Sequence, residues 1–367
     1  MYEIPLIKPV ITDALKERVT QVLDSGYLTE GPVTREFEQR IAGFCGAARC
    51  LAVTSCTTGL ELALRALGIG PGHEVIVPDY TYPATASVVN IVGATAVIVD
   101  VDPDTMLMDS DALEAAVTER TRAVIPVSLF GNPLDWKRLN EIRQRHGLYM
   151  VEDAACALGS SFDGIMTGAL ADISVFSHHP RKFITTGEGG TVTTNNTEWA
   201  EWMHSYKHFG MGAATSRAGS QFSRIGTNYK MSNLLAAVGL EQMGMVNDLL
   251  AERRRLADVY REKLDGADGI SLPAITPDGE HSWQTFCVFV PERDRVMADM
   301  RAAGIEVQIG TFSLHMHEAF ADNPLCRIEG DMSGSIRAYN EALALPLYHG
   351  MTEAEQDKVL ETLKKVL

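Results

Sequence analysis

A lysine between a hydroxyl residue and a glycine cluster is the strongest chemical signal in this 367-residue chain. Lys182 follows Ser177 by five positions and precedes the segment Gly187-Glu188-Gly189-Gly190. A lysine amine is a nucleophile only when neutral, and the apolar neighbours Phe183 and Ile184 favour that form. Most lysines are solvated surface charges, so the amine needs partners elsewhere in the sequence. The pattern indicates a lysine that forms a Schiff base with a phosphorylated aldehyde cofactor.

An acidic residue at the end of an apolar run is the first candidate partner. Asp153 follows Glu152 at the end of residues 148–151, which read as a buried strand. In open α/β sheets, ligands gather at the carboxyl ends of strands, and a carboxylate there keeps a pyridine nitrogen protonated so that the ring accepts electrons. The alternative is that Asp153 caps a helix.

A cluster of hydroxyl residues between a strand and a helix is the second candidate partner. Residues 51–53 read as a strand, and an apolar helical pattern is expected to begin near Thr58. Free amides and the positive dipole end of that helix would bind a phosphate, with the hydroxyls of Thr57, Thr58 and Ser177 as further donors. Serine and threonine also cap helices that bind nothing, so the value of this cluster lies in its agreement with Lys182 and Asp153.

Taken in order, these residues resemble the DegT/DnrJ/EryC1/StrS aminotransferases, pyridoxal-phosphate enzymes of the aspartate aminotransferase fold type I. The resemblance runs nearly end to end, through residues 25–32, 37–38, 66–78 and 345–348. It implies an α/β fold with a large domain, residues 1–245, in which a mostly parallel seven-stranded sheet lies between helices. A smaller α+β domain, residues 246–367, would follow.

The resemblance also implies a role for each matching residue. Lys182 would make the internal aldimine with pyridoxal 5'-phosphate, Asp153 would pair with the pyridine nitrogen, and Tyr82 would stack on the ring. The positions that match the phosphate-binding residues are Ser177, Thr57 and Thr58. Asn228 matches an asparagine that reaches the phosphate from the neighbouring subunit, so the active site would be complete only in a homodimer.

Three positions depart from the family pattern. Cys156 stands where a glutamine usually contacts the cofactor's phenolic oxygen or the sugar, and cysteine is the shorter and weaker donor. Cys56 replaces the usual glycine of the phosphate loop, and His178 replaces the aromatic residue after the phosphate-binding serine. Lys182 itself is retained where the related sugar dehydratases have histidine, which favours transamination over dehydration.

The resemblance implies transfer of an amino group from L-glutamate to the keto group of a nucleotide-linked keto-deoxy sugar, in amino-sugar biosynthesis for a surface polysaccharide or a glycosylated metabolite. Pyridoxamine phosphate would be the intermediate form, and freed Lys182 would shuttle the proton. The polar residues that are the main candidates for contact with the acceptor are Arg224, Lys230 and His315. Weaker candidates are Arg181, Lys207, His208 and His317. Two alternatives stay open: a keto-cyclitol or free keto sugar as acceptor, and a pyridoxal-phosphate-binding regulatory protein.

Composition agrees with an enzyme of this kind. Lys plus Arg number 32 against 48 Asp plus Glu, a formal net charge of −16 that argues against nucleic-acid binding. The six cysteines lack paired metal-ligand spacing, so no metal is expected and a reduced cytoplasm fits best. There is no apolar stretch of about twenty residues, so no membrane partner is expected.

Periodicity predicts how these residues are positioned. Apolar runs predict buried strands at residues 74–78, 95–101, 123–127, 149–152 and 173–176, and helical spacing predicts helices at 11–24 and 111–118. One long amphipathic segment, 233–255, would connect the two domains. Strands at 283–290 and 304–310 and a terminal helix at 352–366 would complete the second domain.

Overall fold

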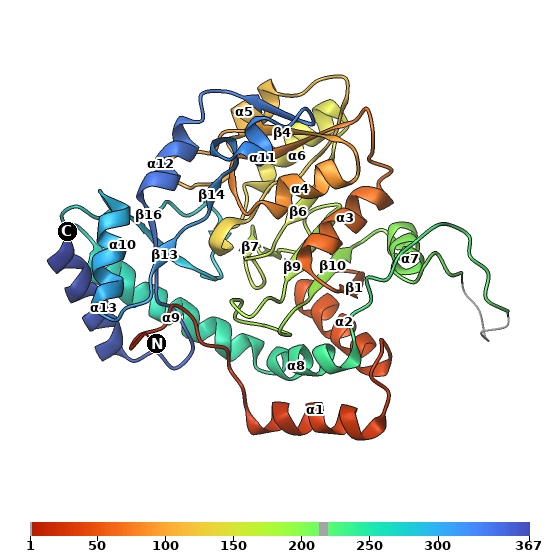
Figure 1. Ribbon diagram of the computed structural model, residues 1–367, viewed down its shortest axis with the longest axis horizontal. Helices are drawn as coiled ribbons and strands as arrows, with labels where there is room; N and C mark the ends of the chain where they lie inside the picture. Colours follow the sequence, from red (N-terminus) through yellow and green to blue (C-terminus); the bar gives the residue numbers. More distant parts are fainter. Residues whose placement is uncertain (1, 213–218) are drawn as a thin grey trace.

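The computed structural model describes residues 2–212 and 219–367 and is built around one eight-stranded sheet (Figure 1). The strands lie in the order β1 (Arg49–Val53), β10 (Gly190–Thr194), β9 (Ile173–Ser177), β6 (Tyr149–Asp153), β5 (Thr121–Val124), β2 (Glu74–Pro78), β4 (Thr95–Val99) and β15 (Cys326–Glu329). Strand β10 is antiparallel to both of its neighbours, and the other pairs are parallel.

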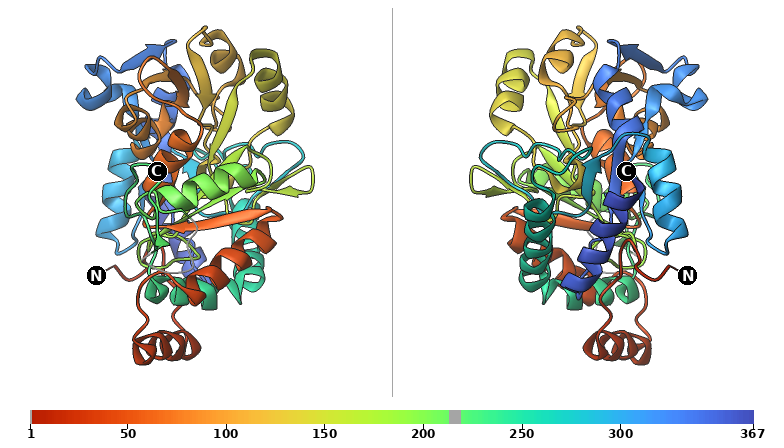
Figure 2. Two further views of the ribbon diagram at one scale, coloured as in Figure 1. Left: turned by 90° about the vertical axis from the view of Figure 1, so that its right-hand side faces the viewer. Right: turned by 90° about the vertical axis from the view of Figure 1, so that its left-hand side faces the viewer.

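Helices cover both faces of this sheet, because its inner strands are apolar on both sides. Along β2, Val75 and Val77 pack in one core cluster with helices α3 (Cys56–Ala66) and α4 (Ala84–Ile91), while Ile76 packs in another with α5 (Ser110–Ala115) and α6 (Trp136–His146). The remaining helices of this part are α1 (Asp13–Ser25), α2 (Pro32–Cys45), α7 (Thr197–Tyr206) and α8 (Asn233–Met243). Helix α1 projects from the body of the molecule (Figures 1 and 2).

A three-stranded sheet forms the carboxyl-terminal part, in the order β12 (Phe286–Phe289), β16 (Ala342–Leu345) and β13 (Gln308–Ile309). It packs with α9 (Val246–Leu264), α10 (Arg293–Ala302), α12 (Ser333–Glu341) and α13 (Glu353–Val366). The amino-terminal residues lie against this part, where Ile4 forms a parallel bridge with Ile305.

Short elements complete the chain. Strand β3 (Tyr80–Thr81) pairs with β14 (Phe312–Ser313), and β7 (Ser161–Phe162) pairs with β8 (Ile165–Met166) and β11 (Gly279–Glu280). Helix α11 (Glu318–Ala321) and 3-10 turns at Leu129–Gly131 and Leu314–Met316 lie between longer elements.

The expected doubly covered, mostly parallel sheet is present, but several details differ from the prediction. Seven strands come from residues 49–194 as expected, and an eighth, β15, returns from the carboxyl-terminal part to pair with β4. The strands expected at 283–290 and 304–310 are shorter in the structure, where they are β12 and β13. Neither strand begins at its predicted first residue, because Trp283 and Gly304 have positive φ angles, 55° and 84°, that lie outside the β region.

The predicted segment 233–255 is two helices rather than one. Helix α8 ends at Gly244, a poor helix former, and α9 begins at Val246. Within the described ranges, no single helix has the length and apolar composition to cross a membrane; α8 and α9 meet that test only as a pair bent by 61°. The domain boundary expected after residue 245 falls at this bend and stays a prediction.

Candidate active site

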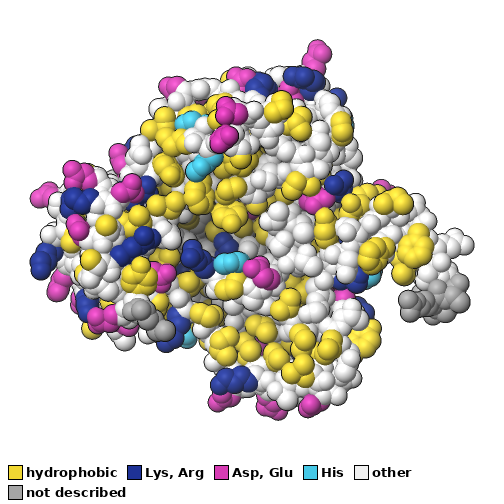
Figure 3. Space-filling model, viewed as in Figure 1, with side chains coloured by type: hydrophobic (Ala, Val, Ile, Leu, Met, Phe, Trp, Pro, Cys, Tyr) yellow, Lys and Arg dark blue, Asp and Glu magenta, His cyan; other side chains and the backbone are white. Residues whose placement is uncertain are grey.

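A cavity of about 660 Å³ opens at the carboxyl ends of β6 and β9, between the large sheet and the carboxyl-terminal part. Figure 3 shows a hollow near the centre of this face, with basic and histidine side chains at its edge. The polar side chains that line the cavity are Ser55, Thr57, Thr81, Tyr82, Asp153, Cys156, Ser177, His179, Arg181, Lys182, Glu188, Gln284, Thr285, Gln308 and Thr311.

Lys182 enters this cavity from the loop that joins β9 to β10. The loop is folded by its own backbone, with the amide of Lys182 donating to the carbonyl of His179 at 2.8 Å and that of Thr186 to His178 at 3.0 Å. The side chain of Lys182 is half-buried, and its Nζ donates to Cys156 Sγ at 2.9 Å. The amine therefore stands beside the residue that departs from the family pattern.

Asp153 is the last residue of β6 and is 4% exposed. Its Oδ2 accepts a hydrogen bond from the Thr85 hydroxyl at 2.8 Å, and its Oδ1 accepts one from the Ala155 amide at 3.2 Å. Burial raises the pKa of Asp153, while these two donors and the nearby Lys182 charge oppose that rise. No helix begins at Asp153 in the structure, so the helix-cap alternative is wrong.

A candidate anion cradle lies where β1 leads into α3. The helix begins at Cys56, two residues before the expected start, and Ser55 is its cap. A side chain at Gly59 would approach Val175 Cγ1 at 2.6 Å, and one at Gly190 would approach the Cys56 amide nitrogen at 2.6 Å. Glycines at these positions let α3 and β10 come close, so the first-turn amides of α3 lie at the cavity.

The hydroxyl residues of the cradle divide into two kinds. Thr57 and Ser177 line the cavity. Thr58 does not: its Oγ1 lies 3.1 Å from the Ser55 amide and 2.9 Å from the Ser55 carbonyl, which completes a capping box. In this chain, Thr58 stabilises the helix start rather than facing the cavity.

Three further sequence candidates lie at or near this site. Tyr82 lines the cavity with its side chain 65% exposed. Burial and the Asp153 carboxylate raise the pKa of the Cys56 thiol. His178 is buried under the loop, where burial lowers its pKa to about 4 and its Nε2 lies 3.0 Å from Thr191 Oγ1. A neutral His178 therefore supports the loop.

Four predicted residues do not line the cavity of their own chain. Lys230 lies beside Asn228 Oδ1, with its Nζ 5.0 Å from the centre of the Phe209 ring. The guanidinium of Arg224 lies 5.4 Å from the centre of the Trp202 ring, and His315 Nδ1 lies 2.6 Å from Asp79 Oδ2. Contacts of these residues with a substrate or with a second subunit stay predictions.

Two of the weaker acceptor candidates are in contact with acidic side chains. Lys207 is fully buried, and its Nζ lies 2.9 Å from Glu30 Oε2 and 3.2 Å from Glu38 Oε1. His208 Nε2 lies 3.3 Å from Glu30 Oε1. The nitrogen donors of His204 and His208 and the Glu30 carboxylate lie within 4.8 Å of one another, but the Lys207 ammonium already supplies a cation there.

The sequence prediction missed two residues that touch its own candidates. Thr85 donates to Asp153 across 68 positions, and Gln284 accepts from the amide of Phe183 across 101 positions. Thr85 follows Tyr82 in the first turn of a helix that begins at the cavity, a weak signal that was available. No local pattern distinguishes Gln284 from other glutamines.

The chemistry of the cavity fits a phosphorylated aromatic aldehyde. Lys182 provides an amine, and the buried Asp153 provides a carboxylate from a neighbouring strand. The first-turn amides of α3 and the hydroxyls of Thr57 and Ser177 could hold an anion, and Tyr82 could offer an aromatic face. These groups match the aldehyde, the ring nitrogen and the phosphate of pyridoxal phosphate.

Comparison with known proteins agrees with this chemistry over the whole chain. Residues 9–364 match the model of the DegT/DnrJ/EryC1/StrS aminotransferase family. GDP-perosamine synthase from Caulobacter vibrioides is 37% identical over 96% of this chain and 95% of its own. The spore coat polysaccharide biosynthesis protein SpsC from Bacillus subtilis is 34% identical over 99% of this chain and 97% of its own.

One protein of similar structure has been solved in both PLP and PMP forms. The putative sugar aminotransferase Spr1654 from Streptococcus pneumoniae, in its PLP form, is 31% identical, covers 100% of this chain and 98% of its own, and has a TM-score of 0.92. Its PMP form matches with a TM-score of 0.93. This chain therefore belongs to the DegT/DnrJ/EryC1/StrS aminotransferase family and is a pyridoxal-phosphate-dependent aminotransferase of fold type I.

Proposed function

We propose that this aminotransferase moves an amino group from L-glutamate to the keto group of a nucleotide-linked keto-deoxy sugar. The observation that carries the proposal is the convergence of Lys182, Asp153 and the α3 amino terminus on one open cavity of about 660 Å³. Pockets of several hundred Å³ are typical for ligands of this size. The similar GDP-perosamine synthase, named for a nucleotide-linked amino sugar, supports this acceptor class.

Each residue has a defined task in this proposal. Pyridoxal phosphate, when bound, supplies an electron sink. Lys182 Nζ holds the cofactor and, once released, moves a proton. The Asp153 carboxylate keeps the ring nitrogen protonated, and Thr57, Ser177 and the first-turn amides of α3 bind the phosphate.

The proposal includes a homodimer in which each copy helps to complete the other's site. Asn228 would reach the second copy's phosphate, and Arg224, Lys230 and His315 would contact the acceptor. Large apolar side chains near Asn228 support coverage by another chain: Phe222 is 61% exposed and Ile225 is 93% exposed. Burying such side chains favours association.

The first test is the visible absorption spectrum of the protein loaded with pyridoxal phosphate, before and after addition of L-glutamate. We expect glutamate to bleach the cofactor band in the wild type and to leave the Lys182→Ala variant unchanged. A panel of nucleotide keto sugars should then restore the band in the wild type. Bleaching in Lys182→Ala at the wild-type rate would overturn the role of the lysine.

The panel also decides between acceptors. Recovery of the band with a free keto-cyclitol or free keto sugar, and with no nucleotide-linked sugar, would contradict the nucleotide part of the proposal. Alanine at Arg224 or Lys230 should raise the Michaelis constant of the acceptor while sparing the glutamate half-reaction. Loss of that half-reaction would contradict the assignment of these two residues.

A further inference from the structure

The side chain of Gln284 forms hydrogen bonds with the backbone of the residues before and after Lys182. Its Oε1 accepts from the amide of Phe183 at 3.1 Å, and its Nε2 donates to the carbonyl of Arg181 at 2.8 Å. We propose that Gln284 is a positioning residue that fixes the backbone of Lys182 so that Nζ faces the cavity. This inference rests on the proposed role of Lys182.

The two hydrogen bonds use both ends of the carboxamide of Gln284. A carboxamide offers an acceptor oxygen and a donor NH₂ group on one planar group, so a single side chain meets both backbone groups. The loop between β9 and β10 has no neighbouring strand at Phe183, and Phe183 is buried. Without Gln284, the buried Phe183 amide would lose its acceptor, which destabilises this part of the loop. The glutamine therefore adds to the loop's own backbone hydrogen bonds at the position of Lys182.

A buried arginine holds Gln284 in turn. Arg253 in α9 is 2% exposed, and it donates to the carbonyl of Trp283 at 2.9 Å and to that of Gln284 at 2.6 Å. Its guanidinium also lies 5.5 Å from the centre of the Phe183 ring. Burial lowers the pKa of Arg253 to about 10, which leaves the side chain charged at neutral pH.

This arginine is paired with carbonyls and an aromatic ring rather than with an acid. Within residues 2–212 and 219–367, no carboxylate forms an ion pair with Arg253. A buried charge without an opposite charge is costly, so its hydrogen bonds must offset that cost. Arg253 contacts both the glutamine and the lysine loop, and it therefore links α9 to the position of Lys182.

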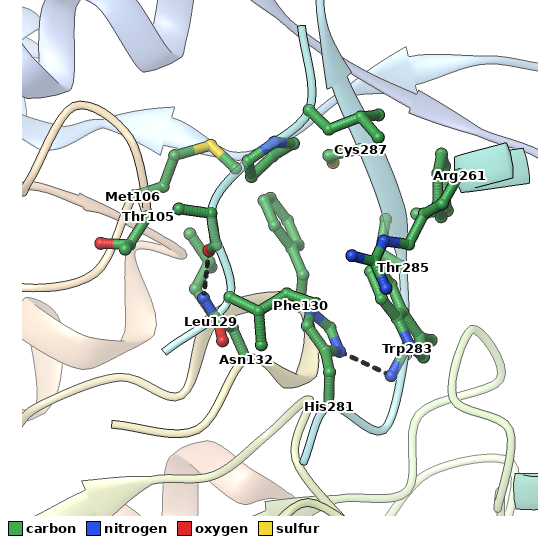
Figure 4. A pocket seen from close by; sticks show the side chains of 15 residues that line it. Thr105, Met106, Leu129, Phe130, Asn132, Arg261, His281, Trp283, Thr285 and Cys287 are labelled. Carbon is green, nitrogen blue, oxygen red and sulfur yellow. Dashed lines mark hydrogen bonds between the residues drawn. The ribbon is translucent and has the colours of Figure 1, made fainter. Parts of the chain in front are cut away.

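The segment that carries Gln284 is itself held in a fixed shape. Figure 4 shows His281 and Trp283 beside a small cavity of about 20 Å³ and marks the bond of 2.8 Å between His281 Nδ1 and the Trp283 amide. The two rings stack with centres 3.9 Å apart, and Trp283 has a φ of 55°. Non-glycine residues adopt this conformation at a cost that surrounding contacts must offset.

The same segment is hydrogen-bonded, on either side of Gln284, to the 3-10 turn Leu129–Gly131 that follows β5. The amide of Ser282 donates to the carbonyl of Gly131 at 3.1 Å, and that of Thr285 donates to Phe130 at 3.2 Å. The glutamine thus reaches Lys182 from a fixed base. A fixed base is what a positioning residue needs, because a displacement of about 1 Å at a reacting group can slow a reaction about 100-fold.

We call the two hydrogen bonds from Gln284 to the backbone beside Lys182 the clamp. The first experiment tests this clamp in the protein without the cofactor. Gln284→Met keeps the length of the side chain and removes both bonds. In the cofactor-free protein, we expect hydrogen exchange at the Phe183 amide to become at least about tenfold faster. The matched control is Gln356→Met, since Gln356 is also buried and bonded to a carbonyl, that of Leu256 at 2.8 Å, in a different part of the fold.

The second experiment measures the loaded enzyme. We expect Gln284→Met to slow the glutamate half-reaction by about 10- to 100-fold, with the half-saturating glutamate concentration changed by less than about twofold. Arg253→Lys should give a smaller change of the same kind, and the two substitutions together should slow the reaction by less than the product of their separate effects.

The outcomes separate the clamp from the function. Unchanged Phe183 exchange and an unchanged rate in Gln284→Met, with Lys182→Ala inactive, would overturn the clamp and leave the proposed function intact. An active Lys182→Ala would overturn the proposed function, while the exchange result would still decide the clamp. If Gln284→Met fails to fold, Gln284→Glu decides: it keeps the acceptor for Phe183, so fast exchange at that amide would contradict the proposal.

Discussion

We expect Glu152 to make the stability of this enzyme depend on pH near neutrality. It precedes Asp153 in β6, is fully buried, and points to the opposite face of the sheet. Its carboxyl group accepts hydrogen bonds from Ser128 Oγ at 2.6 Å and Ser174 Oγ at 2.8 Å. Burial raises the pKa of Glu152 to about 7, because these donors only partly replace water.

The direction of the effect follows from the two pKa values. The folded value of about 7 lies above the unfolded value of 4.5, so the folded protein holds this proton more tightly. The resulting stabilisation is fully present below pH 4.5 and is lost as the pH rises through about 7. A difference of about 2.5 units, at about 1.4 kcal/mol per unit, corresponds to a loss of about 3 kcal/mol.

The substitution Glu152→Gln removes this titration. We expect the free energy of unfolding of the variant, relative to wild type, to increase by about 3 kcal/mol between pH 5 and pH 8. Urea unfolding of the cofactor-free proteins at intervals of one pH unit measures it. The control is Glu361→Gln, an exposed glutamate in α13. Parallel pH curves for Glu152→Gln and wild type would refute the reasoning.

Three other substitutions test separate parts of the site. Gly190→Ala places a carbon 2.6 Å from the first amide of α3, so pyridoxal phosphate affinity should fall at least about tenfold in a fluorescence titration. Thr85→Val removes a donor from Asp153, so the glutamate half-reaction should slow about tenfold in stopped-flow absorbance, with the fold retained. Lys207→Met removes the buried ammonium that pairs with the half-buried carboxylates of Glu30 and Glu38, and it should cost about 3 kcal/mol in urea unfolding. An unchanged value in any of these assays would contradict the corresponding contact.

The sheet was predictable where its strands are buried on both faces. Strand β2 has the bounds predicted from its apolar run, and β6 and β9 each extend the prediction by one residue. Strand β5 begins two residues earlier and ends at Val124, two positions before Pro126, which lacks a donor for a ladder. Strand β15 was missed because it lies at the edge of the sheet, alternates charged and apolar residues, and is half-exposed.

The residues that line the cavity were predictable from the sequence, whereas the residues that hold them in place were not. Lys182, Asp153 and Thr57 follow the ends of strands in one sheet, and the carboxyl ends of such strands meet at one edge. The capping box of Thr58 was not predicted, although a threonine three residues after a serine offers this local use of the hydroxyl; its contact with the phosphate stays a prediction. Thr85 acts on a residue 68 positions away and had only the weak signal of its place beside Tyr82. Gln284 acts on a residue 101 positions away, and no local pattern encodes that contact.

The structure divides the tasks of the site between two parts of the chain, and this division makes the effects of variants separable. Groups expected to hold the cofactor, namely the α3 amides, Thr57 and Asp153, belong to the large sheet and its helices. The clamp on Lys182 comes from the segment 281–285 and α9. Changes in the cradle should therefore lower cofactor affinity, whereas changes in the clamp should lower the rate at which Lys182 moves its proton. A clamp variant that lost affinity in proportion to rate would show that the two parts act as one unit.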